Sequence, residues 1–233
     1  MRPPDASDPL ADAAVAGIRN GMVVGLGTGR AATRGIHALA RRAAAERLNL
    51  RCVATSKASA DLATQLGLRV EPMEGVESVD YLFDGADEVD PQLRMIKGRG
   101  GAMTREKIVA QASRFRIYLV QTDKLVQRLG EKAPLPIEVL RFGLASTRRA
   151  LGALGLRGGL RLRENGSVYE TDNGNPVIDA PLPAGADPER LARSLDAMAA
   201  VVGHGLFLDE ADVVLSEDGT GKVTEQRRKK SSG

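Results

Sequence analysis

Acidic side chains crowd one short segment of the sequence. Residues 84–90 read DGADEVD, with four carboxylates in seven positions. They follow an apolar run at 79–83 that is typical of a buried strand. Lys97, a glycine-rich turn at 98–101 and Glu106, in the first turn of an expected helix, come next. Carboxylates and a lysine beside flexible backbone, at the carboxyl end of a strand, suit proton transfer on an anionic substrate.

The acidic run also suggests two other interpretations. A solvated turn is the simpler one, because charged residues are mostly exposed. A calcium loop requires oxygen ligands at positions 1, 3 and 5 and glycine at position 6. Counted from Asp84, position 3 is Ala86 and position 6 is Val89, so this spacing predicts no metal site.

Composition limits the classes of protein that this chain can be. With 233 residues it is long enough for one large or two modest domains with a real core. We find no run of about 18 apolar residues that would span a membrane, and the first ten residues lack the apolar segment of a signal peptide. The single cysteine, Cys52, has no disulfide partner. These features predict a cytoplasmic protein without a membrane partner.

The positive charge is concentrated at one end of the chain. Residues 222–233 contain five basic side chains and one acid. Their net charge of +4 exceeds the net charge of +3 of the whole sequence. The body is therefore slightly acidic, and tryptophan is absent. A nucleic-acid-binding body would need a basic face or an aromatic stacking surface. We therefore expect no nucleic-acid partner and a disordered, solubilising basic tail.

A second glycine-rich loop precedes the acidic one. Residues 25–30 read GLGTGR, between a predicted strand at 22–25 and a predicted helix that runs to about 48. The dinucleotide-binding motif requires glycine where Arg30 stands, and the Walker loop requires Lys and Ser or Thr where Arg30 and Ala31 follow. The loop is thus either a general cradle for an anion at a helix start or only a tight turn.

Strands and helices alternate through the first half of the chain. Further strands are predicted at 50–54, 68–70, 79–83, 93–96 and 116–121, and helices at 57–66 and 104–114. A short helix at 122–125 brings Lys124 to the carboxyl end of the last of these strands. Repeated strand–helix units predict an α/β fold, a Rossmann-like domain whose parallel sheet is covered on both faces.

The pattern changes after two prolines, Pro134 and Pro136. An extended segment at 137–141, a helix at 147–154, a hairpin around Asn173-Gly174 and a helix at 187–201 predict a smaller inserted α+β domain. The predicted domains are therefore 1–130 plus 204–221 for the α/β catalytic domain, 131–203 for the smaller lid or oligomerisation domain, and 222–233 for the disordered tail.

Seven motifs together resemble the ribose-5-phosphate isomerase A family. They read GLGTGR, ATSKAS, DGADEVD, KGRGGAMTREK, TDKLV, PLPIEV and TDNGNPVID, and they occur in the family's order. The resemblance implies an enzyme that interconverts ribose 5-phosphate and ribulose 5-phosphate in the non-oxidative pentose phosphate pathway. It also implies that no metal or nucleotide cofactor takes part, and that the chain forms a homodimer or a dimer of dimers in the cytoplasm.

The same resemblance assigns roles to individual residues. Glu106 would be the base that moves a proton between C1 and C2, and Lys97 would stabilise the developing oxyanion. Asp84 and Asp87 would serve ring opening and hydroxyl binding. The implied substrate- and phosphate-binding residues are Gly27, Thr28, Gly29, Arg30, Ala31, Gly85, Ala86, Gly98, Arg99, Gly100 and Lys124.

Departures from the family pattern leave alternatives open. The family's phosphate loop commonly reads GTGST, but Arg30 and Ala31 stand in place of its two hydroxyl residues, and Arg99 replaces a usual glycine. Arg30 could bind phosphate with its guanidinium, block the site or change the substrate. A non-catalytic sugar-phosphate sensor and an isomerase of another phosphosugar are therefore the alternative functions. A sensor of the repressor type would need a DNA-binding unit, and we expect none before the first strand at 22.

Overall fold

The chain folds into two compact units. The computed structural model describes residues 8–229. Within them, unit 1 comprises 8–86, 105–124 and 210–229, and unit 2 comprises 87–104 and 125–209. The backbone passes from one unit to the other four times, so neither unit is a continuous stretch of sequence.

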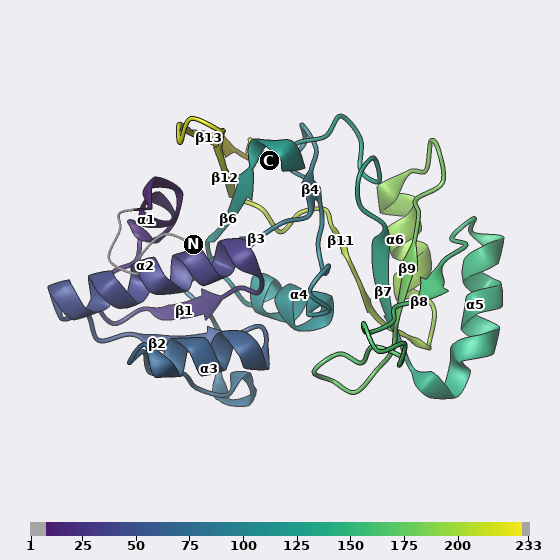
Figure 1. Ribbon diagram of the computed structural model, residues 1–233, viewed down its shortest axis with the longest axis horizontal. Helices are drawn as coiled ribbons and strands as arrows, with labels where there is room; N and C mark the ends of the chain where they lie inside the picture. The colour runs from purple at the N-terminus through teal and green to yellow at the C-terminus, as the bar shows by residue number, and fades with distance from the viewer. Residues whose placement is uncertain (1–7, 230–233) are drawn as a thin grey trace. The chain divides into compact units, whose positions relative to one another are not determined.

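Unit 1 is built on a six-stranded sheet with the order β13-β12-β6-β3-β1-β2 (Figure 1). The strands are β1 (Val23–Leu26), β2 (Arg51–Ala54), β3 (Tyr81–Gly85), β6 (Arg116–Gln121), β12 (Val213–Glu217) and β13 (Val223–Arg227). Only β12 and β13 pair antiparallel, and the other pairings are parallel. The helices are α1 (Pro9–Val15), α2 (Arg30–Glu46), α3 (Lys57–Gln65) and α4 (Met103–Gln111), whose first two residues belong to unit 2, with single 3₁₀ turns at η1 (Met73–Gly75) and η2 (Thr122–Lys124).

Helices cover both faces of this sheet, as the strand–helix alternation predicts. Under α1, α2 and α3, alternate strand positions supply a buried core that includes Val24, Leu26, Phe83, Ile117, Leu119 and Val213. Gly25 points to the other face, where an added Cβ would lie 2.9 Å from both Leu82 and Val109 of α4. Helix α4 therefore packs on the second face. The predicted fold class, α/β with a Rossmann-like parallel sheet and a smaller α+β unit, is confirmed.

The strand order determines where a ligand would bind to unit 1. From β2 through β1, β3 and β6 to β12, the parallel strands follow the doubly wound order 2-1-3-4-5, which reverses direction between the first and third strands. Ligands of such sheets bind outside the carboxyl ends of the strands at this reversal. The glycine loop after β1 and the acidic motif at the end of β3 lie there.

Unit 2 contains two antiparallel sheets. The larger has the order β10-β7-β9-β8, and the smaller has the order β11-β5-β4. The strands are β4 (Glu88–Val89), β5 (Met95–Ile96), β7 (Leu135–Val139), β8 (Gly159–Leu160), β9 (Val177–Ala180), β10 (Val201–His204) and β11 (Leu206–Phe207). Helices α5 (Leu144–Ala153) and α6 (Pro188–Asp196) share one apolar core with β7 and β9, and η3 (Arg141–Gly143) precedes α5.

Local sequence signals account for several helix ends. Asp8 caps α1 by accepting the Ala11 N–H at 3.1 Å, with Pro9 in the first turn. Ser56 caps α3 in the same way, and Gly67, with φ of +81°, follows its end. Helix α6 ends at Asp196, earlier than predicted, because a turn at 197–200 leads into β10, whose first residue Val201 pairs with Val139 of β7.

The predicted hairpin at Asn173-Gly174 is present only as a turn. Gly174 has a positive φ of +81°, and the Thr171 N–H donates to the Asn175 carbonyl at 2.9 Å. The segment before the turn makes only isolated bridges, while β9 pairs with β7 and β8. The predicted strand at 68–70 is likewise a single bridge to β2. Such short segments have too few partners to form a ladder.

The unit boundaries and the C-terminal segment differ from the predicted organisation. Residues 87–104 fall in unit 2, and β11 pairs with β5 there and not with the sheet of unit 1. The predicted disordered tail begins at 222, but Val223–Arg227 form β13, which pairs with β12 along its whole length. Most residues of β13 are polar, as expected for an edge strand. The sequence therefore shows no apolar alternation that would reveal this strand. Residues 230–233 lie outside the described part.

Within residues 8–229, no helix combines the length and the apolar content needed to cross a membrane.

We predict that deleting 222–233 lowers the stability of the protein. The deletion removes β13, partly buried Val223, and the Arg228 side chain that donates to the Ala211 carbonyl at 2.8 Å. The loss of these hydrogen bonds should cost about 2 kcal/mol, which lowers Tm by roughly 4–8 °C. Thermal unfolding of the deleted protein, compared with a control that lacks only 230–233, measures this fall in Tm. An unchanged Tm in the longer deletion would show that β13 contributes no net stability.

Candidate active site

Asp84 joins the two loops at the carboxyl ends of β1 and β3. Its side chain is fully buried, and Oδ1 accepts the N–H groups of Thr28 at 3.0 Å and Gly85 at 2.7 Å. A Cβ at Gly27 would lie 2.6 Å from the Asp84 Cα and closer still to its carboxylate. Glycine is therefore required at position 27 for this contact, although its φ is not positive.

Side chains of the segment after β2 hold the glycine loop through hydrogen bonds. Thr55 Oγ1 donates to the Leu26 carbonyl at 3.1 Å, and its 2.7 Å contact with Thr28 Oγ1 must then be donated by Thr28. Ser59 Oγ donates to the Gly27 carbonyl at 2.7 Å. The hydroxyls of the ATSKAS motif thus hold the backbone and one side chain of the predicted phosphate loop.

The start of α2 has the features of an anion-binding helix end. Gly29 occupies the cap position with φ of +91° and provides no side-chain cap, so the first N–H groups of this 17-residue helix point out of its end. Arg30 is exposed, and no hydrogen bond or ion pair of its side chain is formed within residues 8–229. Lys124 is half-buried at the end of η2, after the neighbouring strand β6.

Glu106 lies on the face of the sheet that Asp84 shares. Because Phe83 faces the α2 side, Asp84 faces the α4 side, and so does its parallel partner Tyr118. Glu106 is 3% exposed in the first turn of α4, one turn before Val109, which packs on that face. Asp84, Tyr118 and Glu106 therefore gather on one buried surface of unit 1.

The electrostatics of Tyr118 agree with this grouping. Burial raises the pKa of Tyr118 well above its ordinary value, and the negative charges of Asp84, Glu210 and Glu106 raise it further. The phenol is thus neutral at physiological pH and keeps its proton. It is a polar, uncharged group among the carboxylates of this face.

The remaining predicted catalytic residues belong to unit 2. Asp87 is half-buried; its N–H donates to the Ile96 carbonyl at 2.8 Å, and its Oδ2 accepts the Arg99 N–H at 2.9 Å. Lys97 is 2% exposed, and its ammonium nitrogen lies 5.5 Å from the centre of the Phe207 ring. An ammonium over an aromatic face is attracted by the ring quadrupole, which helps to orient it.

The glycine turn after Lys97 is held by two distant side chains of the same unit. Arg161 Nη1 donates to the carbonyls of Gly98 at 3.2 Å and Arg99 at 2.9 Å, while its other nitrogens pair with Asp179. The Tyr169 hydroxyl donates to the Gly100 carbonyl at 3.0 Å. The backbone of the turn is therefore fixed, and the exposed Arg99 side chain projects from it.

Two acids of the DGADEVD motif have structural roles. Glu88 is fully buried and accepts the N–H groups of Gly130 and Ala133, both at 2.6 Å, and of Lys132. Asp90 accepts two backbone N–H groups of its own turn and pairs with Arg94. Both carboxylates are satisfied by donors of unit 2, so neither is a candidate for the proton transfer.

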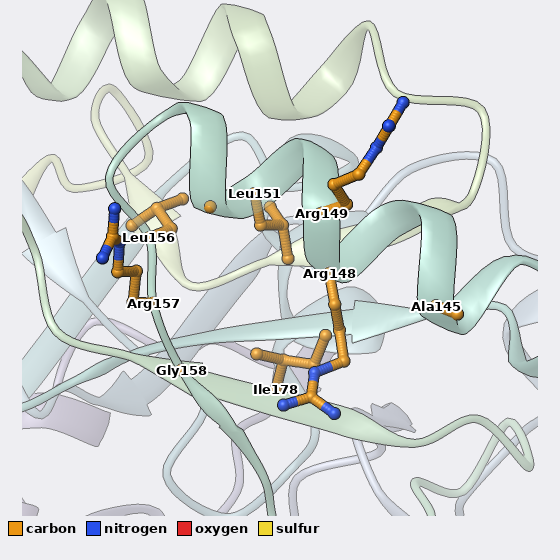
Figure 2. Close-up of a pocket in the computed structure, with 9 residues that line it drawn as sticks. Ala145, Arg148, Arg149, Leu151, Leu156, Arg157, Gly158 and Ile178 are labelled. Carbon is orange, nitrogen blue, oxygen red and sulfur yellow. The ribbon is translucent and has the colours of Figure 1, made fainter.

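A separate hollow of about 540 Å³ lies in unit 2 (Figure 2). It is formed by α5, the segment 156–158 and Ile178. Figure 2 shows that Arg149 points away from Arg148 and Arg157, so the exposed guanidinium groups do not converge. All the lining residues lie outside the predicted site.

Known proteins share both the sequence and the fold. The family model for ribose 5-phosphate isomerase A (phosphoriboisomerase A) matches residues 51–221. The enzyme of Roseiflexus sp. strain RS-1 is 45% identical over 212 residues, which cover 90% of this chain and 91% of the relative. The chain belongs to the ribose 5-phosphate isomerase A family.

Solved structures agree with this assignment. Ribose 5-phosphate isomerase A from Methanocaldococcus jannaschii has a TM-score of 0.89 and 36% identity, with 94% of this chain and 96% of that chain covered. A D-ribose-5-phosphate isomerase in complex with phospho-erythronic acid has a TM-score of 0.90 and 34% identity, with coverage of 95% and 97%. This family member is therefore an enzyme, an aldose–ketose isomerase.

The predicted site residues of this isomerase fall into two sets. In unit 1 the structure brings together the residues at the strand reversal, Gly27, Thr28, Gly29, Arg30, Ala31, Asp84 and Gly85, and places Ala86, Glu106 and Lys124 in the same unit. In unit 2 it places Asp87, Lys97, Gly98, Arg99 and Gly100 along one short segment. Their assigned roles stay predictions.

Sequence reasoning missed several residues that support these sets. Tyr118 lies in an apolar strand, where strand alternation alone does not mark it as polar. Arg161 and Tyr169 lie more than 60 positions from the turn that they hold. Glu138 of β7, which is fully buried and accepts a hydrogen bond from Thr104, did carry a signal, because a carboxylate inside the apolar run of the PLPIEV motif is rarely buried without a partner.

Gly27→Ala should displace Asp84 and abolish most activity. The added methyl group would overlap the carboxylate and the Asp84 backbone, so the contact with Thr28 N–H cannot form. A buried carboxylate that loses its donors costs about 1–3 kcal/mol. We expect Tm to fall by several degrees and kcat/KM to fall with it.

Gly75→Ala is the matched control. Gly75 lies in the same unit without a positive φ, and none of the described atoms lies within 4 Å of its added Cβ. Its Tm and isomerase rate should match those of the unchanged protein. Equal activity in Gly27→Ala would contradict the close packing of this loop on Asp84.

Proposed function

We propose that this protein interconverts D-ribose 5-phosphate and D-ribulose 5-phosphate through an enediolate, in the non-oxidative pentose phosphate pathway, with Glu106 as the general base. The observation that supports it most is the place of Glu106: a buried carboxylate in the first turn of α4, on the sheet face shared with Asp84. The positive end of the helix dipole favours the ionised carboxylate, which is the form that a base needs.

The proposed chemistry moves one proton between two carbons. Ionised Glu106 takes the proton from C2 of the open-chain aldose, the electron pair forms the C1–C2 double bond, and negative charge develops on the carbonyl oxygen of C1. Protonated Glu106 then returns the proton to C1, while the proton of the C2 hydroxyl passes to the oxygen of C1 and the C2 carbonyl forms. We assign Lys97 to the developing oxyanion, and Asp84 and Asp87 to ring opening and hydroxyl binding.

A related structure supports a phosphorylated sugar chain as the ligand. The D-ribose-5-phosphate isomerase with a TM-score of 0.90 is in complex with phospho-erythronic acid. That compound carries a phosphate and a planar, negatively charged carboxylate on a hydroxylated chain. A planar anion with two oxygens imitates an enediolate, so such an acid should inhibit this protein in competition with ribose 5-phosphate.

Glu106→Gln should abolish turnover while substrate still binds. The amide keeps the shape of the side chain and cannot accept the proton, so kcat should fall by at least about 10²-fold. Steady-state conversion of ribose 5-phosphate and a direct binding measurement test this. Glu46→Gln, which changes a solvent-exposed residue at the end of α2, is the control and should be fully active. Near-normal kcat in folded Glu106→Gln would move the base to another carboxylate, Asp84 first.

We also propose that the loop at the start of α2 binds the phosphate through Thr28, its N–H groups and Arg30, together with Lys124. Arg30 is exposed beside this helix end, and a guanidinium there would add charge-assisted bonds to the anion. These bonds take the place of the hydroxyl groups that the family's usual loop provides.

Arg30→Ala should raise KM for ribose 5-phosphate by roughly 10- to 150-fold, which corresponds to about 1.5–3 kcal/mol, with a smaller change in kcat. Arg30→Ser restores the family's usual residue and should recover part of the loss. Arg19→Ala, at an exposed position elsewhere in unit 1, serves as the control. A lower KM in Arg30→Ala would show that the arginine obstructs the site and that another phosphosugar is the substrate. Unchanged KM in both variants would place Arg30 outside the site.

A further inference from the structure

Glu138 of β7 is a fully buried carboxylate. Its donors are neutral side chains from two other segments: Thr171 Oγ1 at 2.7 Å, Asn175 Nδ2 at 2.9 Å and Asn173 Nδ2 at 3.2 Å on Oε1, and Thr104 Oγ1 on Oε2. An ionised carboxylate accepts about four hydrogen bonds, so these donors satisfy it. The group is thus a closed polar cluster inside unit 2.

The cluster ties together two segments that are far apart in the sequence. One is the turn at 171–175, which is itself closed by the Thr171 N–H donating to the Asn175 carbonyl at 2.9 Å. The other is the start of α4, because Thr104 lies in its first turn. Glu138 therefore links Thr104, at the beginning of α4, to the turn at 171–175, and all three belong to unit 2.

The neighbouring strand is shaped to admit Thr104. Gly203 of β10 is the register partner of Glu138. A Cβ at Gly203 would overlap Thr104 Oγ1 and would lie 3.1 Å from Thr104 Cβ. Gly203 has no positive φ, so its backbone would accept a larger residue. The close approach of Thr104 is what requires glycine here.

We propose that Glu138 is a positioning residue for the reaction: through Thr104 it fixes the first turn of α4, and with it the backbone from which Glu106 projects. The inference rests on the proposed function, in which Glu106 is the base. Thr104 and Glu106 are two residues apart in one helical turn, so a shift of Thr104 moves the backbone of Glu106. A misplacement of about 1 Å can cost up to about 10²-fold in rate.

Removal of the Thr104 hydroxyl tests the link without changing the size of the side chain. Thr104→Val should lower kcat by about 10-fold or more and leave KM within about 2-fold, because the base is misplaced while substrate contacts remain. Thr104→Ser keeps the hydroxyl and should retain most of the wild-type kcat. Glu138→Gln should lower kcat as well. The kcat of the double variant Thr104→Val/Glu138→Gln should be little below that of the less active single variant, since both substitutions break the same link.

Thr147→Val is the matched control for the loss of a buried hydroxyl. Thr147 Oγ1 donates to the Gly143 carbonyl at 2.7 Å in α5 of the same unit, and the residue is 5% exposed. This variant should lower Tm without changing kcat. A structural role alone would make Thr104→Val behave in the same way.

The outcomes separate this inference from the proposed function. Wild-type kcat in Thr104→Val, or equal losses in Thr104→Val and Thr104→Ser, would overturn the positioning role while an inactive Glu106→Gln still supports the base. If Glu106→Gln keeps its turnover, the assignment of the base fails and the positioning role fails with it. A fall of kcat in Thr104→Val alone, with Thr104→Ser and Thr147→Val active, supports both.

Discussion

The structure of unit 1 depends on one buried carboxylate. Asp84 has no exposed surface, and a buried charge is tolerated only when hydrogen bonds replace its water. The N–H groups of Thr28 and Gly85 provide those bonds, so the loops after β1 and β3 are joined at the reversal of the strand order. The absence of a side chain at Gly27 follows from the same contact. The geometry of the glycine loop is thus set by the acid that it packs against.

The acids of the DGADEVD motif divide into two kinds. Asp84 lies on the sheet face of Glu106, whereas Glu88 and Asp90 accept hydrogen bonds from backbone N–H groups and an arginine of unit 2. This explains how so many carboxylates can follow one strand in a folded protein. Each buried one has a fixed set of donors, and only part of the motif is left for chemistry.

Support for the candidate site comes from distant parts of the chain. Arg161 and Tyr169 hold the carbonyls of the glycine turn, and Glu138 holds the start of α4. The contact of Glu138 with Thr104 is partly buried, where hydrogen bonds are stronger and unmet partners are costly, whereas the contacts of Arg161 with Arg99 and of Tyr169 with Gly100 are exposed. The small unit therefore acts as a frame for residues 98–104, which lead directly into the helix of Glu106.

The sequence by itself determined the alternation of strands and helices, the two-unit character of the chain and the motifs that show the family. These features are local or periodic, so short-range sterics and burial patterns reveal them. Only the tertiary structure decided that Val223–Arg227 complete the sheet, that 87–104 belong with unit 2, which acids are structural, and that Glu138 meets Thr104. The contacts of Glu88 with Gly130 and of Glu138 with Thr104 join residues more than 30 positions apart in the chain. The pairing of β13 with β12 is closer in sequence, but its polar residues carry no apolar pattern. Residue types and spacing leave the choice of partner open until the backbone brings the groups together.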